Sequence, residues 1–382
     1  MEFSTLYFLA FLLSGSSGAT PLDSYPHSEK HHVKRAITPV VAGTPEVLGV
    51  ASDPALDRDS CTSVRVDARS LWTCRDTSNA GTPLTFFVSS TASWSDFNSD
   101  GTPKVENGVL SMYGSNSVPY FTIGSDLCGP GGNCDDGTRY AIWPNSRPLP
   151  VTNEDGSYSL YTWINQAHLQ GLTLLNPDSA ATLYRSDVAA GDTSDSLPPV
   201  TVVDEAFWPA GSILYGNYGF VVSDNTAYLY GALSNSAGIA VAKVPVGSIE
   251  DKSAYSYFTN SGGWSTTAPG ITDTDAAIPN AGTGGQGTFY YSSYFGSFVW
   301  IGAPAIGVNA DFYIATAPSP EGPWSEPVLF YSGAVGTAPL PAYSQQAHPD
   351  MSEDAGNGKD IYLTYTKVDD VYSTPLIHVV WE

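Results

Sequence analysis

Residues 227–232 read Ala-Tyr-Leu-Tyr-Gly-Ala, an alternation of aromatic and small or aliphatic side chains that is typical of a β-strand. Four other stretches of the 382-residue chain share this pattern and follow a turn: Ser70-Leu71-Trp72-Thr73, Ser159-Leu160-Tyr161-Thr162-Trp163, Phe298-Val299-Trp300-Ile301-Gly302-Ala303 and Asp360-Ile361-Tyr362-Leu363-Thr364-Tyr365. The intervals between successive repeats are 89, 67, 71 and 63 residues, measured on Trp72, Tyr161, Tyr228, Val299 and Tyr362. The sequence therefore contains a repeating unit built around a strand.

Each of the last three repeats is followed, after a loop, by a second strand pattern: Ile239-Ala240-Val241-Ala242-Lys243-Val244, Phe312-Tyr313-Ile314-Ala315-Thr316 and Ile377-His378-Val379-Val380-Trp381. Two further strands per unit would give the four-stranded blade of a β-propeller. The long first interval contains Cys128 and Cys134, so we expect an insertion there. We predict an all-β, five-bladed β-propeller; another large antiparallel β protein, such as a jelly roll with extensions, is the alternative.

The composition agrees with many strands joined by tight turns. The chain holds 37 Gly, 28 Pro and 23 Tyr, and apolar residues do not recur at helical spacing over any long window. The chain is also too long for a single β-sandwich.

The N-terminus predicts secretion. Residues 6–13 are an apolar run of eight, too short to span a bilayer, and small residues follow as a signal peptidase requires. We expect a signal peptide at 1–19 and a propeptide at 20–35 that is removed after Lys34-Arg35, as in fungal-type processing; an ordinary charged linker is the alternative. The mature extracellular chain, 36–382, would be a single propeller domain.

The net charge limits the partners of the protein. With 38 acidic and 15 basic residues, the chain carries −23 at pH 7, which repels nucleic acid and anionic membranes. We therefore expect no nucleic-acid or membrane partner.

The four cysteines fall in two close pairs. Cys61 with Cys74, and Cys128 with Cys134, indicate two local disulfides in an oxidising compartment. No histidine that would remain after processing lies near a cysteine in the sequence, so a metal site is not expected. No Gly-rich phosphate loop or EF-hand spacing occurs, so we also expect no cofactor.

A propeller assembles its site from residues that lie far apart in the sequence, about one contribution per blade. Asp59 and Asp76 flank the first repeat strand, and a Cys61–Cys74 bridge would bring their segments together. We expect both carboxylates at the mouth of the central funnel.

Three further candidates lie near other repeat strands. Glu205 stands close to Trp208-Pro209, while His348 and Asp350 precede the fifth repeat. Each also has an ordinary structural explanation, because Asp residues cap turns and Trp-Pro pairs often pack in cores.

Several motifs resemble a family of secreted propeller domains that includes bacterial endo-D-arabinanases, and more loosely the five-bladed arabinanases and β-xylosidases. The similarity covers about two thirds of the mature chain in patches, from about Asp57 to the end. The motifs that carry it are Trp208-Pro209-Ala210-Gly211, Tyr228-Leu229-Tyr230-Gly231, Val241-Ala242-Lys243-Val244, Ser319-Pro320-Glu321-Gly322-Pro323-Trp324-Ser325, His348-Pro349 and Tyr362-Leu363-Thr364-Tyr365. The motifs are short, and the Ser319–Ser325 turn marks a propeller blade rather than an activity.

The resemblance implies glycoside hydrolysis by paired carboxylates. The family's Asp in an Arg-Asp setting and its Asp in a Gly-Asp-Thr setting correspond to Asp59 and Asp76, although Arg75 here replaces the Gly. Arg75 beside Asp76 would favour a base or nucleophile, or it would mark a site that has diverged. Glu205 is the third candidate carboxylate and a candidate general acid.

We therefore expect a secreted, monomeric glycoside hydrolase that acts on a cell-wall polysaccharide or oligosaccharide, such as an arabinan or another furanosyl glycan. Arg75, Trp208, His348 and Asp350 would bind the substrate. A non-catalytic carbohydrate-binding propeller or secreted effector is the alternative, since Trp and Tyr stack on sugar rings. A polysaccharide lyase is the third possibility, and the acidic net charge disfavours its uronate substrates.

Overall fold

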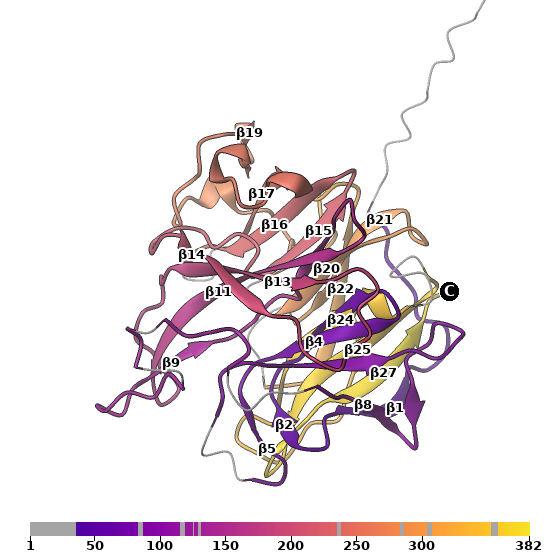
Figure 1. Ribbon diagram of the computed structural model, residues 1–382. Coiled ribbons are helices and arrows are strands. Elements are labelled where there is room, and N and C mark those ends of the chain that lie inside the picture. Colours follow the sequence, from indigo (N-terminus) through magenta and orange to yellow (C-terminus); the bar gives the residue numbers. More distant parts are fainter. Residues whose placement is uncertain are drawn as a thin grey trace, which may run out of the picture. The chain divides into compact units, whose positions relative to one another are not determined.

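The computed structural model describes residues 36–382 except 83–86, 115–118, 125, 129–130, 235–237, 283–285, 304–307 and 353–357. The predicted signal peptide and propeptide, residues 1–35, lie outside the described residues. In the described residues, the regular structure is almost entirely strand (Figure 1). Four short 3-10 helices are described: η2 Val246–Ser248, η3 Lys252–Ala254, η4 Thr274–Ala276 and η5 Pro349–Met351.

The strands form one two-stranded ladder and five larger sheets. The ladder is β2 Leu56–Arg58 with β5 Thr77–Asn79. The first sheet, in the order β3-β4-β6, consists of β3 Thr62–Val66, β4 Arg69–Cys74 and β6 Thr91–Asp96. The second sheet, in the order β10-β11-β13-β14, adds β9 and β12 to β11; its strands are β9 Arg139–Ile142, β10 Leu149–Thr152, β11 Tyr158–Gln170, β12 Thr173–Leu174, β13 Ala181–Val188 and β14 Val200–Trp208.

The remaining sheets follow in chain order. The third sheet, numbered consecutively across its width, consists of β15 Gly219–Ser223, β16 Thr226–Ala232, β17 Ile239–Pro245, β18 Ser256–Thr259 and β19 Gly263–Ser265. The fourth sheet consists of β20 Gly287–Ser292, β21 Ser297–Gly302, β22 Asp311–Ala317 and β23 Val328–Ser332. The fifth sheet, in the order β24-β25-β27-β1-β8-β7, consists of β24 Ala342–His348, β25 Asp360–Val368, β26 Tyr372–Ser373, β27 Pro375–Val380, β1 Glu46–Ser52, β8 Val109–Ser111 and β7 Val105–Glu106, with β26 paired to β25.

The five repeats of the sequence occupy equivalent places. They lie on β4, β11, β16, β21 and β25, and each is the second strand of a different sheet. The second strand patterns fall on β17, β22 and β27, each the next strand across its sheet. The prediction of an all-β, propeller-like chain is therefore confirmed. Four sheets have at least the four strands of a blade, and the first sheet has three.

Strand β1, near the start of the described chain, pairs with β27 at its end. It pairs antiparallel with β27 and parallel with β8, so the fifth sheet is completed by residues from both ends of the domain. Gly49, with φ +133°, allows β8 to approach, since a Cβ at this position would lie 1.8 Å from the Gly108 carbonyl oxygen.

Both predicted disulfides, Cys61–Cys74 and Cys128–Cys134, are formed. The first connects the residue before β3 to the last residue of β4, next to the paired Thr62 and Thr73. Among the described residues, no helix is long and apolar enough to cross a membrane.

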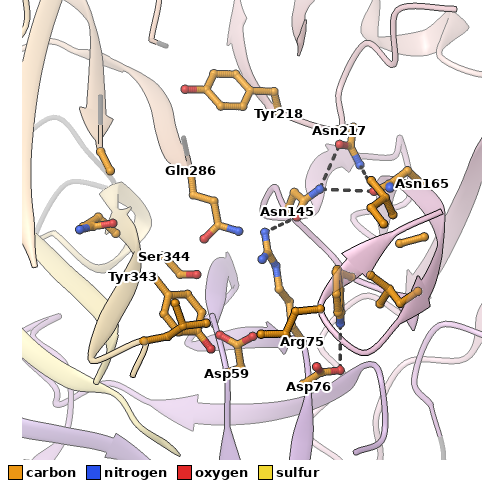
Figure 2. Close-up of a pocket in the computed structure, with 18 of the residues that line it drawn as sticks. Asp59, Arg75, Asp76, Asn145, Asn165, Asn217, Tyr218, Gln286, Tyr343 and Ser344 are labelled. Carbon is orange, nitrogen blue, oxygen red and sulfur yellow. Dashed lines mark hydrogen bonds between the residues drawn. The ribbon is translucent and has the colours of Figure 1, made fainter. Parts of the chain in front are cut away.

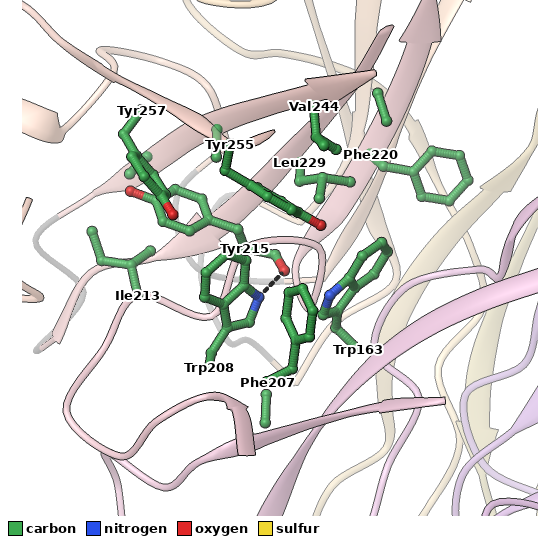
Figure 3. Close-up of a cluster of buried hydrophobic side chains, with 14 of the residues drawn as sticks. Trp163, Phe207, Trp208, Ile213, Tyr215, Phe220, Leu229, Val244, Tyr255 and Tyr257 are labelled. Carbon is green, nitrogen blue, oxygen red and sulfur yellow. Dashed lines mark hydrogen bonds between the residues drawn. The ribbon is translucent and has the colours of Figure 1, made fainter. Parts of the chain in front are cut away.

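Among the described residues, the largest cluster of buried hydrophobic side chains lies between the second and third sheets (Figure 3). Trp208, at the end of β14, is 5% exposed and donates its indole N–H to the Tyr215 carbonyl oxygen at 2.7 Å. Tyr215, Tyr255 and Tyr257 surround it with edge-on or tilted rings. The structure thus places Trp208 in this core rather than on a cavity wall, because burial against these rings removes its apolar surface from water.

Candidate active site

A cavity of about 550 Å³ is lined by residues that lie on, or in segments next to, the strands of all five larger sheets. One polar side chain comes from the strand at the edge of each sheet, or from the segment just before it: Asp59, Asn145, Asn217, Gln286 and Ser344. Figure 2 shows these side chains around Arg75. The repeat strands lie one place further out, so the sequence repeat indicates the sheets but not these residues.

Asp59 lies on the floor of the cavity and is 6% exposed. Its backbone N–H donates to the Asp76 carbonyl at 2.8 Å, and the Arg75 N–H donates to the Asp59 carbonyl at 2.9 Å. These bonds and the neighbouring disulfide bring the two predicted aspartates into one place. Both line the cavity.

Burial raises the pKa of Asp59 to about 7; the Arg75 charge opposes this rise and the Asp76 charge adds to it. The carboxyl accepts a hydrogen bond from the Thr366 hydroxyl at 2.9 Å and one from Tyr343. A carboxyl group with this pKa holds a proton in a substantial fraction of molecules at neutral pH, which is what a general acid requires.

Asp76 has different surroundings. Arg139, on β9, donates to both of its carboxylate oxygens at 3.0 and 2.6 Å, and the Trp143 indole N–H donates at 2.9 Å. Sequence reasoning expected Arg75 to be the partner of Asp76 and did not find Arg139. Arg75 instead donates to the Asn145 side-chain oxygen.

Three asparagines form a hydrogen-bonded group on one wall. Asn145 donates to Asn217 at 3.0 Å, and Asn217 donates to the Trp163 carbonyl at 3.1 Å; Asn165 lies 3.5 Å from each of the two amides. Gly216 has φ +88°, and a Cβ there would lie 2.5 Å from the Trp163 ring. Only glycine therefore lets the chain bring Asn217 to the wall.

Aromatic and apolar side chains complete the cavity. Trp143, Tyr218, Tyr343 and Tyr372 are part of the lining, and burial raises the pKa of both Tyr343 and Tyr372, so these phenols stay protonated. Exposed aliphatic side chains also line it: Leu172, Leu174, Val308 and Leu340.

The structure does not bring Glu205 to this cavity. Glu205 is exposed on β14, the last strand of the second sheet, and does not line the cavity. Its backbone carbonyl accepts hydrogen bonds from the side chains of Gln166 on β11 and Thr182 on β13, which connects β14 to these two strands.

His348 and Asp350 also lie away from the lining. His348 is fully buried, and its two ring nitrogens are 2.7 Å from the hydroxyls of Ser63 and Thr364. Burial lowers the pKa of His348 to about 3, so the ring is neutral and connects β24 to β3 and β25. Asp350 forms an ion pair with Arg147 at 2.5 Å.

The described residues contain no group of three His, Cys, Asp or Glu side chains placed to hold a metal ion. The chemistry that this arrangement can perform is proton transfer and nucleophilic attack by two carboxyl groups in unlike surroundings.

No family model matches the sequence, and no curated protein sequence matches it. The fold is similar to that of a "putative hydrolase" from Bacteroides ovatus, with a TM-score of 0.57, 12% identity and coverage of 87% of both chains. An exo-β-1,3-galactanase from Phanerochaete chrysosporium has a TM-score of 0.48 at 12% identity, covering 91% of this chain and 64% of that one. A family 117 glycoside hydrolase from Zobellia galactanivorans has 0.46 at 10% identity, with 89% and 91% covered. The likeness to the Bacteroides ovatus structure supports the propeller-like fold.

Proposed function

We propose that the protein is a secreted glycoside hydrolase that cleaves a cell-wall polysaccharide or oligosaccharide in this cavity, with an arabinan or other furanosyl glycan as the candidate substrate. The observation that carries the proposal is the pair Asp59 and Asp76, two adjacent carboxyl groups in unlike surroundings on one cavity floor. Unlike surroundings are how enzymes assign acid and base roles to two carboxyl groups.

Asp59 is the proposed general acid. Glu205, the earlier candidate for this role, does not line the cavity. Asp59 donates its proton to the glycosidic oxygen as the bond to the anomeric carbon breaks. Asp76, oriented by Arg139, either attacks the anomeric carbon or takes a proton from the attacking water. In both cases one water is consumed and two sugar products leave.

The rest of the lining fits a sugar. The amides of Asn145, Asn217 and Gln286 both donate and accept hydrogen bonds, as sugar hydroxyls do. Arg75 adds donors at the centre, and the aromatic side chains offer flat faces for a ring.

We also propose that the domain has five blades. The first sheet, β3-β4-β6, has three strands, but Trp94 on β6 exchanges backbone hydrogen bonds with Tyr113 at 2.7 and 3.0 Å. Tyr113 thus occupies the place of a fourth strand, which supports counting this sheet as a blade.

A non-catalytic carbohydrate-binding propeller is the second candidate. Asp76 already accepts three hydrogen bonds, and four of the five edge-strand positions around the cavity carry amides or a hydroxyl rather than carboxylates. A pocket of this kind can bind a glycan without cleaving it.

The test compares the wild type with Asp59→Asn and Asp76→Asn on arabinans, galactans and fungal or mycobacterial wall polysaccharides. Glu205→Gln is the matched control, because it removes a carboxylate outside the cavity. We expect the wild type and Glu205→Gln to release reducing ends equally, and both cavity variants to lose about a thousandfold or more in rate.

Equal product release by Asp59→Asn and the wild type would exclude Asp59 as a catalytic group. Binding of a glycan by the wild type with no product from any of them would favour the second candidate.

A further inference from the structure

The mouth of the cavity carries an apolar rim that glycoside hydrolysis alone does not explain. We define the rim as Leu172, Leu174, Val308 and Leu340, all of which line the cavity. Leu172 is 87% exposed, and the other three are 40–52% exposed. Single exposed aliphatic residues are ordinary on protein surfaces, but four around one cavity form a feature of that cavity.

The rim comes from strand β12, which holds Leu174, and from three loops. Leu172 lies in the two-residue turn between β11 and β12, where Gln170 pairs with Thr173. Turns of this length favour Gly, Asn and Asp, so folding gives no reason for a leucine there. Val308 lies between β21 and β22, and Leu340 lies between β23 and β24.

The floor and the rim differ in chemistry. The floor holds Asp59 and Arg75 with the asparagine group on the wall above them, whereas the rim is aliphatic. Sugar rings bind best on flat aromatic faces, and leucine and valine have none; branched aliphatic side chains match an alkyl chain. Because the floor and the rim enclose one cavity of about 550 Å³, one ligand of ordinary size can contact both.

We propose that the substrate is a glycan that carries an alkyl or acyl chain beside the bond to be cleaved, and that this chain lies against the rim while the sugar occupies the floor. This inference rests on the proposed function for the identity of the floor ligand. A lipid surface is a poorer occupant, since the chain carries −23 and the rim surrounds a cavity.

The test uses methyl, butyl and octyl glycosides of arabinofuranose and galactopyranose, below their micelle concentrations. Binding is measured by calorimetry and cleavage by product release. For at least one of the sugars we expect the dissociation constant to fall with each chain extension, by at least about tenfold from methyl to octyl, because each buried methylene adds affinity.

The double variant Leu172→Ser/Leu340→Ser should lose this chain-length gain. Leu329→Ser is the matched control, since Leu329 is 48% exposed on β23 and does not line the cavity. Both changes are at exposed positions, so the folded state should persist, which circular dichroism checks.

Equal affinity for methyl and octyl glycosides, or a chain-length gain that survives in the double variant, would overturn the inference. So would rim-dependent binding to phosphatidylcholine vesicles without any glycoside. If the octyl glycosides bind with the expected gain but nothing is cleaved, the hydrolase proposal fails and this inference stands. If polysaccharides are cleaved but chain length has no effect on binding, the hydrolase proposal stands and this inference fails.

Discussion

The carboxyl group of Asp59 is buried, and the Arg75 charge offsets the effect of burial only in part, whereas Asp76 beside it is held by Arg139. Burial raises the pKa of Asp59 from its ordinary 3.8 to about 7. Between these two values the folded protein keeps a proton that the unfolded chain has released. The free energy of unfolding therefore falls as pH rises through this window, and the loss is complete above pH 7.

Asp59→Asn removes this titration, so the variant should gain stability relative to the wild type as pH increases. The expected gain between pH 4 and pH 8 is about 2–4 kcal/mol. Denaturant unfolding at pH 4, 6 and 8 measures it. A stability difference between the two proteins that is the same at all three pH values would contradict the raised pKa.

Arg139 orients Asp76 through two hydrogen bonds, so we expect Arg139→Ala to lower kcat/KM by about a hundredfold. Arg139→Lys should recover part of the activity, since lysine keeps the charge but not the paired donors. Arg185→Ala is the control, because Arg185 pairs with Asp187 and Glu250 on the surface. Equal activity of the Arg139→Ala and Arg185→Ala proteins would show that Asp76 needs no such partner.

At the residue scale, the sequence predicted Asp59, Arg75 and Asp76 because they lie next to one repeat strand and one cysteine pair. It did not predict Asn145, Asn217 or Gln286; asparagine before a strand is common in turns, so it does not by itself indicate a site. Their position is the signal that could have identified two of them, since Asn217 and Gln286 come within two residues of the start of an edge strand. The sequence analysis expected Glu205 in the site, because nothing in the residues around it indicates that β14 is the outermost strand of its sheet.

At the scale of elements, the Cys61–Cys74 bridge connects the segment of Asp59 to that of Arg75 and Asp76. Replacing both cysteines by alanine should lower the free energy of unfolding by about 3 kcal/mol, and removing the shorter Cys128–Cys134 loop by about 2 kcal/mol. Thermal unfolding with and without reductant checks this. An unchanged midpoint in the Cys61→Ala/Cys74→Ala protein would show that the strand pairing alone holds these segments.

The aromatic alternation predicted the second strand of every sheet, because those strands are covered on both sides by neighbouring sheets and keep large side chains. The edge strands β10, β20 and β24 have no common pattern. Of these three, only β24 contributes residues of its own to the lining, whereas Asn145 and Gln286 come from the segments before β10 and β20. Strand repeats thus predict sheets more readily than they predict the site.

At the scale of the molecule, the first described residues after the predicted cut at Arg35 are hydrogen-bonded to the rest of the domain. The Ile37 N–H donates to the Thr316 hydroxyl at 2.8 Å, and the Ala42 N–H donates to the Val380 carbonyl at 2.7 Å. We therefore predict that the secreted protein begins at Ala36 and unfolds at the same temperature as a recombinant 36–382 chain. N-terminal sequencing that finds Thr20 as the sole start would show that no propeptide is removed.

The contribution of β1 to the fifth sheet can be tested by a substitution that adds one methyl group, Gly49→Ala. In Gly49→Ala the new Cβ would fall on the Gly108 carbonyl, and the φ of +133° is strained for alanine, so β1 and β8 must separate. We expect the free energy of unfolding to fall by roughly 3 kcal/mol or more. Gly270→Ala is the control, because its Cβ would meet nothing within 4 Å and its φ is not positive. If both variants unfold at the wild-type midpoint, the pairing of β1 with β8 does not contribute to holding the domain closed. If only Gly49→Ala is destabilised, β1 helps to close the domain, because it is also the partner of β27.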